Sequence, residues 1–200
     1  MRKVFIDCGA NDGCSVRCFR DTIPGADEFE IHSFEANPNL NKYFPIDGVQ
    51  YYNKAVWVED GTISFYNVSV DKYGNDSGET GASTVCEQKA LYNIAPGRHE
   101  ENEIINVESI DLSKWIMSNF NKDDFIVLKL DVEGAEYDIL PKMIEDGSMQ
   151  YVNELLIEFH NKKCGHTLRE DRMLTEKINS YGIPITEWDA DKPEYKAHAR

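Results

Sequence analysis

The feature that most constrains the fold is an almost unbroken apolar run, Phe125–Leu130, followed at once by the charged segment Asp131–Glu136. A strand that is apolar on both faces is typical of a parallel sheet covered by helices. Shorter apolar runs predict strands at Lys3–Asp7, Ile31–Glu35 and Leu155–Phe159, and segments of helical spacing lie between them. This alternation predicts an α/β fold with a mostly parallel sheet and helices on both faces.

The remaining elements follow the same alternation. Helices are expected at Cys14–Arg20, at Asn39–Phe44 after a possible cap at Asn37, and at Leu112–Asn119, Tyr137–Glu145 and Leu168–Tyr181. Further strands are expected at Tyr51–Val56, Ile104–Val107 and Ile183–Trp188, with a hairpin through Asp60-Gly61 into Thr62–Tyr66. The polar tail Asp189–Arg200 is expected to fray. A chain of 200 residues with this pattern predicts a single domain, residues 1–200.

One long segment, residues 67–101, breaks the pattern. It is rich in glycine, serine, asparagine and aspartate and shows little periodicity. Structureless loops of this length are uncommon inside a compact domain and often form a lid or a binding segment. A surface excursion with no role is an equally good interpretation.

Charge excludes some partners. The chain has 21 Lys and Arg against 36 Asp and Glu, a formal net charge of −15. Such a surface repels the phosphates of nucleic acids and of anionic membranes, so neither is expected as a partner. No apolar run is long enough to span a bilayer, and no signal peptide is recognisable, so a cytoplasmic location is expected. The five cysteines are expected to be reduced, and Cys14 and Cys18 to pack rather than bind metal.

The first predicted loop indicates the cofactor class. The segment Asp7-Cys8-Gly9-Ala10-Asn11-Asp12-Gly13 has glycines that allow a tight turn into a helix, whose first N–H groups attract an anion. Its spacing is not the Gly-x-Gly-x-x-Gly of nicotinamide sites. Asp7 would repel a diphosphate, whereas S-adenosylmethionine carries an ammonium, a sulfonium and one carboxylate. We therefore expect S-adenosylmethionine rather than NAD.

A second carboxylate supports a nucleoside ligand. Glu35 closes the next predicted strand, 22 residues after Gly13. A carboxylate at this place accepts both ribose hydroxyls in nucleotide-binding folds. Both NAD and S-adenosylmethionine contain a ribose, so Glu35 does not choose between them. The alternative is that Asp7 only caps the helix and that Glu35 is a surface acid.

The densest charged cluster attached to a predicted strand is Lys129-Leu130-Asp131-Val132-Glu133-Gly134-Ala135-Glu136. A lysine so close to a sheet interior needs a carboxylate partner, for which Asp131, Glu133 and Glu158 are candidates. Glu133 and Glu136 also favour the start of the helix that follows. The cluster therefore indicates either a reaction site or a charged helix start.

Four segments together resemble the FkbM family of S-adenosylmethionine-dependent methyltransferases. They are Val4–Gly13, His32–Pro38, Lys129–Glu136 and Leu156–His160, and the expected Gly61–Tyr66 hairpin is also similar. The resemblance implies a Rossmann-like class I methyltransferase fold and methyl transfer mainly to oxygen, with substrates that include sugars and polyketides.

The resemblance, which spans residues 4–159, also implies roles for single residues. Asp7, Gly9 and Gly13 would line the methionine part of the cofactor, and Glu35 would hold its ribose. Asp131 would lie beside the sulfonium, where the acceptor enters. The other residues expected to bind the cofactor are Ala55 and Val56 near the adenine, and Ala10, Asn11 and Ala36.

The expected catalytic residues follow the last two buried strands. Methylation of a hydroxyl requires a group that accepts its proton. His160 is the expected base, because an unperturbed imidazole is largely neutral at pH 7; Asp131 and Glu133 are alternatives, and Lys129 completes the set. His160 is equally well interpreted as a solvated loop histidine. Asp131, Glu133, Glu158 and His160 have the ligand types of a metal site, but the resemblance does not require one and we expect none.

The leading functional hypothesis is an O-methyltransferase acting on a sugar or another small hydroxyl acceptor. A nicotinamide-dependent oxidoreductase is the alternative from another enzyme class, and Asp7 and the missing third glycine argue against it. A non-catalytic nucleoside-binding module is the third hypothesis. The sequence does not indicate the acceptor or the oligomeric state.

Overall fold

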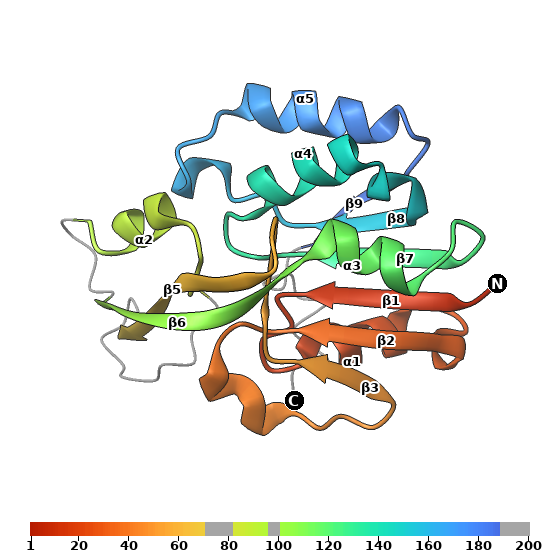
Figure 1. Cartoon of the computed structure of the whole chain (residues 1–200), viewed down its shortest axis with the longest axis horizontal. Helices are drawn as coiled ribbons and strands as arrows, with labels where there is room; N and C mark the ends of the chain where they lie inside the picture. The colour runs from red at the N-terminus through yellow and green to blue at the C-terminus, as the bar shows by residue number, and fades with distance from the viewer. Residues whose placement is uncertain (71–81, 96–100, 189–200) are drawn as a thin grey trace.

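The central sheet positions the site, because all its strands run parallel and their carboxyl ends share one edge. The computed structural model describes residues 1–70, 82–95 and 101–188 (Figure 1). The central strands are β1 (Lys3–Cys8), β2 (Phe29–Phe34), β3 (Val49–Tyr52), β7 (Phe125–Leu130), β8 (Val152–Ile157) and β9 (Ile185–Glu187). Their order is β3-β2-β1-β7-β8-β9, and every neighbouring pair is parallel.

Helices cover both faces of this sheet. They are α1 (Cys14–Thr22), α3 (Leu112–Asn119), α4 (Glu136–Asp146) and α5 (Leu168–Asn179). Successive strand residues point to opposite faces, so Phe5 and Val127 cluster with Phe19 of α1. Their neighbours Ile6 and Leu128 instead belong to a larger cluster with side chains of α3, α4 and α5. The predicted α/β architecture is therefore confirmed.

A smaller sheet packs against the central one. It consists of β4 (Ala55–Trp57), β5 (Gly61–Val70) and β6 (Glu101–Asp111) in the order β4-β6-β5. Figure 1 shows β5 and β6 as a long arm that extends away from the central sheet, with α2 (Glu87–Asn93) beside it. Val56 and Ile110 pack in the same hydrophobic cluster as Ile6 of β1, so the two sheets share one core.

Two predictions about this smaller sheet were wrong. Tyr51–Val56 is not one strand, because the chain turns between β3 and β4 and the Asn53 amide holds the turn by donating to the Glu35 carbonyl at 2.8 Å. The expected hairpin at Gly61 is also absent. The strand β5 pairs antiparallel with β6, and β4 pairs parallel with β6, because the eleven-residue β6 offers far more backbone partners than the three-residue β4.

The segment expected to be structureless is partly regular. Residues 67–70 belong to β5, Glu101 begins β6, and α2 lies between them. A two-turn helix is too short to show a helical period, and its buried side includes the polar residues Lys89 and Asn93, both of which donate to the Ala82 carbonyl. Residues 71–81 and 96–100 lie outside the described part of the chain.

The other elements lie close to their expected places. The predicted helix after Asn37 is a 3-10 helix, and the Asn37 side chain caps it by accepting from the Asn39 N–H at 3.0 Å. The 3-10 helices are η1 (Ala26–Glu28), η2 (Pro38–Tyr43), η3 (Ser148–Tyr151) and η4 (Asn161–Lys163). The expected fraying of residues 189–200 concerns residues outside the described ranges. Within those ranges, no helix has the length and apolarity needed to cross a bilayer.

Candidate active site

The order in which the chain adds strands to the sheet reverses at β1. From β1 the sheet continues through β2 on one side and through β7 on the other. Ligands of open parallel sheets bind beyond the carboxyl ends of the strands at such a point. The loops that follow β1, β2, β7 and β8 are therefore the candidate active site.

Glycine is required where the first loop meets the loop after β7. Gly9 and Gly13 both have a backbone φ of 80°, a conformation that favours glycine. A Cβ atom at Gly9 would lie 1.9 Å from the carbonyl oxygen of Asp131. The N–H groups of Gly9 and Ala10 donate to the Phe34 carbonyl at 3.0 and 2.9 Å. The loop is thus fixed by backbone contacts to both neighbouring strands.

The N–H groups of this loop are largely used within the protein. The Asn11 N–H donates to Glu35 Oε2 at 2.8 Å, the Cys14 N–H donates to Asp12 Oδ1 at 2.9 Å, and the Gly13 N–H donates to the Ala10 carbonyl at 2.9 Å. We expected the start of this helix to attract an anionic group. The structure corrects that expectation in part, because the Asp12 carboxylate already accepts from the N–H of Cys14, the first residue of the helix.

Asp7 lies beneath the loop rather than at its surface. Its carboxylate is fully buried, and Oδ2 accepts from the hydroxyls of Ser15 at 2.6 Å and Ser33 at 3.3 Å. Oδ1 lies 3.3 Å from Lys129 Nζ on the adjacent strand. The sequence argument treated Asp7 as an uncompensated charge facing the ligand, and this premise was wrong.

Lys129 joins two of the three carboxylates that were expected to bind the cofactor, Asp7 and Asp131. Its ammonium donates to the Gly9 carbonyl at 2.6 Å and also lies 3.5 Å from Asp131 Oδ2. Burial by itself lowers the pKa of Lys129, but the charges of Asp7 and Asp131 outweigh it and raise that pKa. The formal charges of Asp7, Lys129 and Asp131 sum to one net negative charge. The preference for a cationic ligand therefore belongs to the trio rather than to Asp7 alone.

Glu35 closes the other side of the first loop. Its carboxylate accepts from the N–H groups of Asn11 at 2.8 Å and Asn37 at 2.7 Å. Burial raises the pKa of Glu35, and these two hydrogen bonds oppose the shift. A carboxylate has about four lone-pair positions, so two N–H donors leave acceptor capacity for a further ligand.

A second cluster lies beyond β7 and β8. Asp131, Glu133 and His160 each have one oxygen or nitrogen atom that could bind a metal ion, and these three atoms lie within 4.8 Å of one another. His160 Nε2 is 3.3 Å from Glu133 Oε2 and 3.6 Å from Glu158 Oε1, and His160 Nδ1 is 3.2 Å from Glu136 Oε1. The structure therefore brings together the expected catalytic residues and adds two further acids.

His160 is buried among acids rather than exposed in a loop, so the alternative interpretation of a solvated histidine was wrong. Burial by itself lowers the pKa of His160, but the hydrogen bond with Glu136 and the charges of Glu133 and Glu136 outweigh it and raise that pKa to about 9. The expectation of an unperturbed, neutral imidazole is therefore incorrect. In this arrangement His160 is mainly an imidazolium at pH 7.

The carboxylates of the cluster are shifted in different directions. Burial, followed by the negative charge of Asp131, raises the pKa of Glu158 to about 7. Burial also raises the pKa of Asp131, against the attraction of Lys129. For Glu133 burial acts in the same direction, but the neighbouring charges of Lys89 and His160 outweigh it and lower the pKa. Unlike environments for neighbouring acids are typical of reaction sites.

The segment around α2 reaches this cluster from the smaller sheet. Thr84 pairs with Tyr66 of β5 and donates its hydroxyl to the Glu133 carbonyl at 2.7 Å. The buried Lys89 forms an ion pair with the Glu133 carboxylate. Glu133 itself has a backbone φ of 56°, which is rare for a residue with a side chain. Part of the segment 67–101, for which a lid and a surface excursion were equally good interpretations, is therefore attached to the cluster.

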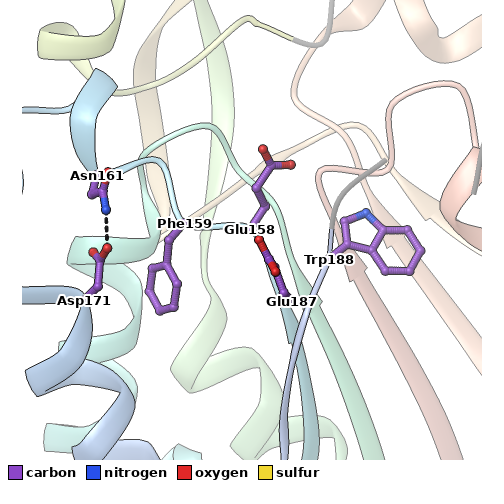
Figure 2. A pocket seen from close by; sticks show the side chains of 6 residues that line it. All are labelled: Glu158, Phe159, Asn161, Asp171, Glu187 and Trp188. Atoms are coloured by element: carbon purple, nitrogen blue, oxygen red, sulfur yellow. Dashed lines mark hydrogen bonds between the residues drawn. The ribbon is translucent and has the colours of Figure 1, made fainter. Parts of the chain in front are cut away.

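A cavity of about 450 Å³ opens next to the cluster at the ends of β8 and β9. Figure 2 shows Glu158 and Glu187 between Phe159 and Trp188, with the hydrogen-bonded pair Asn161 and Asp171 on one side. Lys129 Nζ lies 5.8 Å from the centre of the Trp188 ring. The cavity therefore lies beside both the trio and the acid–histidine cluster.

Three residues expected near the cofactor have mainly packing contacts. Ala55 is buried in a hydrophobic cluster of the smaller sheet, Val56 is buried in the core that the two sheets share, and Ala36 packs against the cluster that contains Ala55. Their role near an adenine stays a prediction. Sequence reasoning did not assign a site role to Ser15, Ser33 or Lys89, and it placed Glu136 only at a helix start. It named Glu158 as a candidate partner of Lys129 and as a possible metal ligand.

Comparison with known proteins identifies the domain. The family model described as the methyltransferase FkbM domain matches residues 7–182. No curated protein and no solved structure gives a significant match to the chain.

Proposed function

Because the chain belongs to the FkbM methyltransferase family, we propose that it transfers the methyl group of S-adenosylmethionine to a hydroxyl oxygen of a sugar or another small acceptor. The observation that carries the proposal is the contact between the two halves of the candidate site. Gly9, in the loop with nucleoside-binding character, packs against Asp131, where the acid–histidine cluster begins. The loop that we assign to the cofactor and the cluster that we assign to the reaction therefore adjoin at one edge of the sheet.

The residues of the first half suit this cofactor. Glu35 would accept hydrogen bonds from the ribose hydroxyls through its remaining lone pairs. The net negative trio of Asp7, Lys129 and Asp131 favours a cationic ligand over a diphosphate. When bound, S-adenosylmethionine supplies an electrophilic methyl group on a positively charged sulfur. Asp131 is the member of the trio that we place nearest to that charge, because its carboxylate is partly exposed.

The residues of the second half suit a hydroxyl acceptor. An acceptor hydroxyl loses its proton on methylation, so a proton acceptor must be within hydrogen-bonding reach. Glu158 lines the cavity and lies next to His160, so its carboxylate is placed to meet an acceptor bound there. The acidic walls of the cavity favour neutral acceptors such as sugars over anionic ones.

Calorimetry of the full chain tests the cofactor. We expect S-adenosylmethionine and S-adenosylhomocysteine to bind and NAD to fail. The change Glu35→Gln should weaken binding by about 10- to 100-fold, the value of one or two hydrogen bonds to a charged group. Glu30→Gln, the same change at the opposite end of β2, is the matched control and should bind normally. NAD binding without S-adenosylmethionine binding would reject the proposal in favour of an oxidoreductase.

A methyl-transfer assay tests the reaction. The chain is incubated with S-adenosylmethionine carrying a labelled methyl group and with a panel of sugars and other hydroxyl compounds. We expect label in at least one hydroxyl acceptor. Cofactor binding without transfer to any member of the panel would support the non-catalytic module instead. A cytosolic location remains our proposal, and the net charge of −15 supports our proposal that nucleic acids are not partners.

A further inference from the structure

We propose that Asp131, Glu133 and His160 bind one divalent metal ion, of the class represented by Mn²⁺, beside the cavity that we assign to the acceptor. The inference reverses our expectation that no metal assists. Its link to methyl transfer rests on the proposed function, whereas binding of the ion itself does not.

The geometry of the three donor atoms suits one ion. They come from different side chains and all lie within 4.8 Å of one another. Ligand atoms about 2.1–2.2 Å from a six-coordinate ion are separated by roughly 3 Å when adjacent and 4.3 Å when opposite. The upper limit of 4.8 Å is close to the separation of opposite ligands, so adjustment of the side chains can bring the three atoms onto one ion. Two carboxylates with one imidazole are hard and borderline ligands, which suit Mn²⁺ and its neighbours better than a soft ion.

The state of His160 is the second, independent observation. Its side chain is almost fully buried, and its Nε2 atom has no hydrogen-bond partner within the described residues. That atom points at Glu133 Oε2, 3.3 Å away, in the middle of the acids. A buried ring nitrogen without a hydrogen bond is costly, so its position requires an explanation. A metal ion supplies one: its binding would displace the proton from Nε2, and the neutral imidazole nitrogen that results is a common metal ligand.

The other ring nitrogen is held as in known metal sites. His160 Nδ1 lies 3.2 Å from Glu136 Oε1, and the Glu136 carboxylate accepts from the N–H groups of Val132 and Gly134, both at 2.9 Å. A histidine that binds metal through one nitrogen usually donates from the other to a carboxylate, which fixes the ring orientation. Glu136 is therefore a positioning residue in the proposal, and His160 presents Nε2 to the ion.

The ion pair between Lys89 and Glu133 leads to a further prediction for the proposed metal site. The Lys89 ammonium forms an ion pair with Glu133, and it reaches the cluster from α2 rather than from the central sheet. A divalent ion and this ammonium are in competition for the same carboxylate. Removing the lysine charge should consequently strengthen ion binding, whereas loss of a purely structural contact would not.

Mn²⁺ titration of the chelator-treated full chain, followed by electron paramagnetic resonance, tests the proposal. We expect one Mn²⁺ site per chain, at least tenfold weaker binding in Glu133→Gln and His160→Gln, and several-fold tighter binding in Lys89→Met. Glu187→Gln removes one charge from the same cavity without touching the three ligands, so it is the matched control and should bind normally. A parallel titration with Mg²⁺, an ion that prefers oxygen ligands, measures whether Mg²⁺ displaces Mn²⁺ from the site at similar concentrations.

Equal binding by wild type and Glu133→Gln, or an equal loss in Glu187→Gln, would overturn the proposal in favour of diffuse attraction to an acidic surface. Circular dichroism checks that each variant is folded, and Glu133→Gln decides the result if His160→Gln is not. Calorimetry with S-adenosylmethionine on the same proteins separates the two proposals. Cofactor binding without an Mn²⁺ site removes this inference alone, and an Mn²⁺ site without cofactor binding removes the proposed function alone.

Discussion

The two ends of strand β7 hold acids in opposite environments. At the amino end, the Asp124 carboxylate accepts from the N–H groups of Arg2 at 2.8 Å and Asn121 at 2.9 Å, and it lies 3.3 Å from the Arg2 guanidinium. At the carboxyl end, Asp131 lies among further acids. The pKa of Asp124 is lowered to about 2, whereas the pKa of Asp131 is raised.

This difference separates acids that stabilise the fold from acids that the fold tolerates. The N–H donors around Asp124 favour its charged form, so its ionisation stabilises the native state. The acids after β7 and β8 oppose one another and leave His160 Nε2 without a hydrogen bond. Conflicts of this kind are expected where a ligand binds. Three stability measurements, from the largest expected effect to the smallest, test whether the division is correct.

The change Lys129→Met should have the largest effect on unfolding free energy. Lys129 lies at the carboxyl end of β7 and yet stabilises the fold, so it is an exception to the division between the two ends. Without the lysine, Asp7 is a fully buried carboxylate with no cation beside it. Breaking a buried pair in this way costs about 3–5 kcal/mol in unfolding free energy. Urea unfolding at pH 7 measures the loss. The double change Asp7→Asn with Lys129→Met should recover most of it, and a double variant as unstable as the single one would contradict this account.

The change Asp124→Asn should cost about 2 kcal/mol in unfolding free energy at pH 7, because the pKa of Asp124 is lowered from 3.8 to about 2. The N–H of Arg2 is the largest cause, followed by the N–H of Asn121. The stabilisation is complete above the unfolded pKa, about pH 4, and disappears as the pH falls through about 2. Asp123→Asn, at the exposed neighbouring residue, is the control. Equal losses in both variants would remove Asp124 from its structural role.

The change Glu158→Gln should have the smallest effect and the opposite sign. Burial and the charge of Asp131 raise the pKa of Glu158 from 4.5 to about 7, while the positive charges of His160 and Lys163 oppose the shift. Stability is therefore lost as the pH rises from about 4.5 to 7, and the variant should exceed wild type by about 1 kcal/mol above pH 7, after discounting for the solvent exposure of the side chain. Unfolding of chelator-treated protein at pH 4 and 8 measures this, and no gain at pH 8 would contradict the crowding of the acids.

Local pattern was sufficient for the elements that carry most of the core. The continuous apolar run Phe125–Leu130 is β7, and Leu112–Asn119 is α3, both with the bounds that were predicted. Short elements with distant partners were not predictable in this way. The helix α2 has only two turns, and β4 is defined by pairing with β6 about fifty residues later. Hydrophobic periodicity carries no information about such pairing.

The candidate site was predictable in its residues but not in its charges. The need of Lys129 for a carboxylate was evident from its place in an apolar strand, yet the register that sets Asp7 opposite Lys129 depends on β1 and β7 being neighbours. His160 was expected to be neutral because a sequence shows no neighbours in space. Its acidic partners come from two segments, Glu133–Glu136 and Glu158, and the fold brings these together.

The ion pair between Lys89 of α2 and Glu133 couples α2 to the candidate site. The Lys89 ammonium and a ligand that binds the Glu133 carboxylate act on the same group, so each changes the free energy with which the other interacts there. Thermodynamic linkage requires these two effects to be equal in free energy. The position of the Lys89 side chain on α2 is therefore coupled to ligand binding at Glu133.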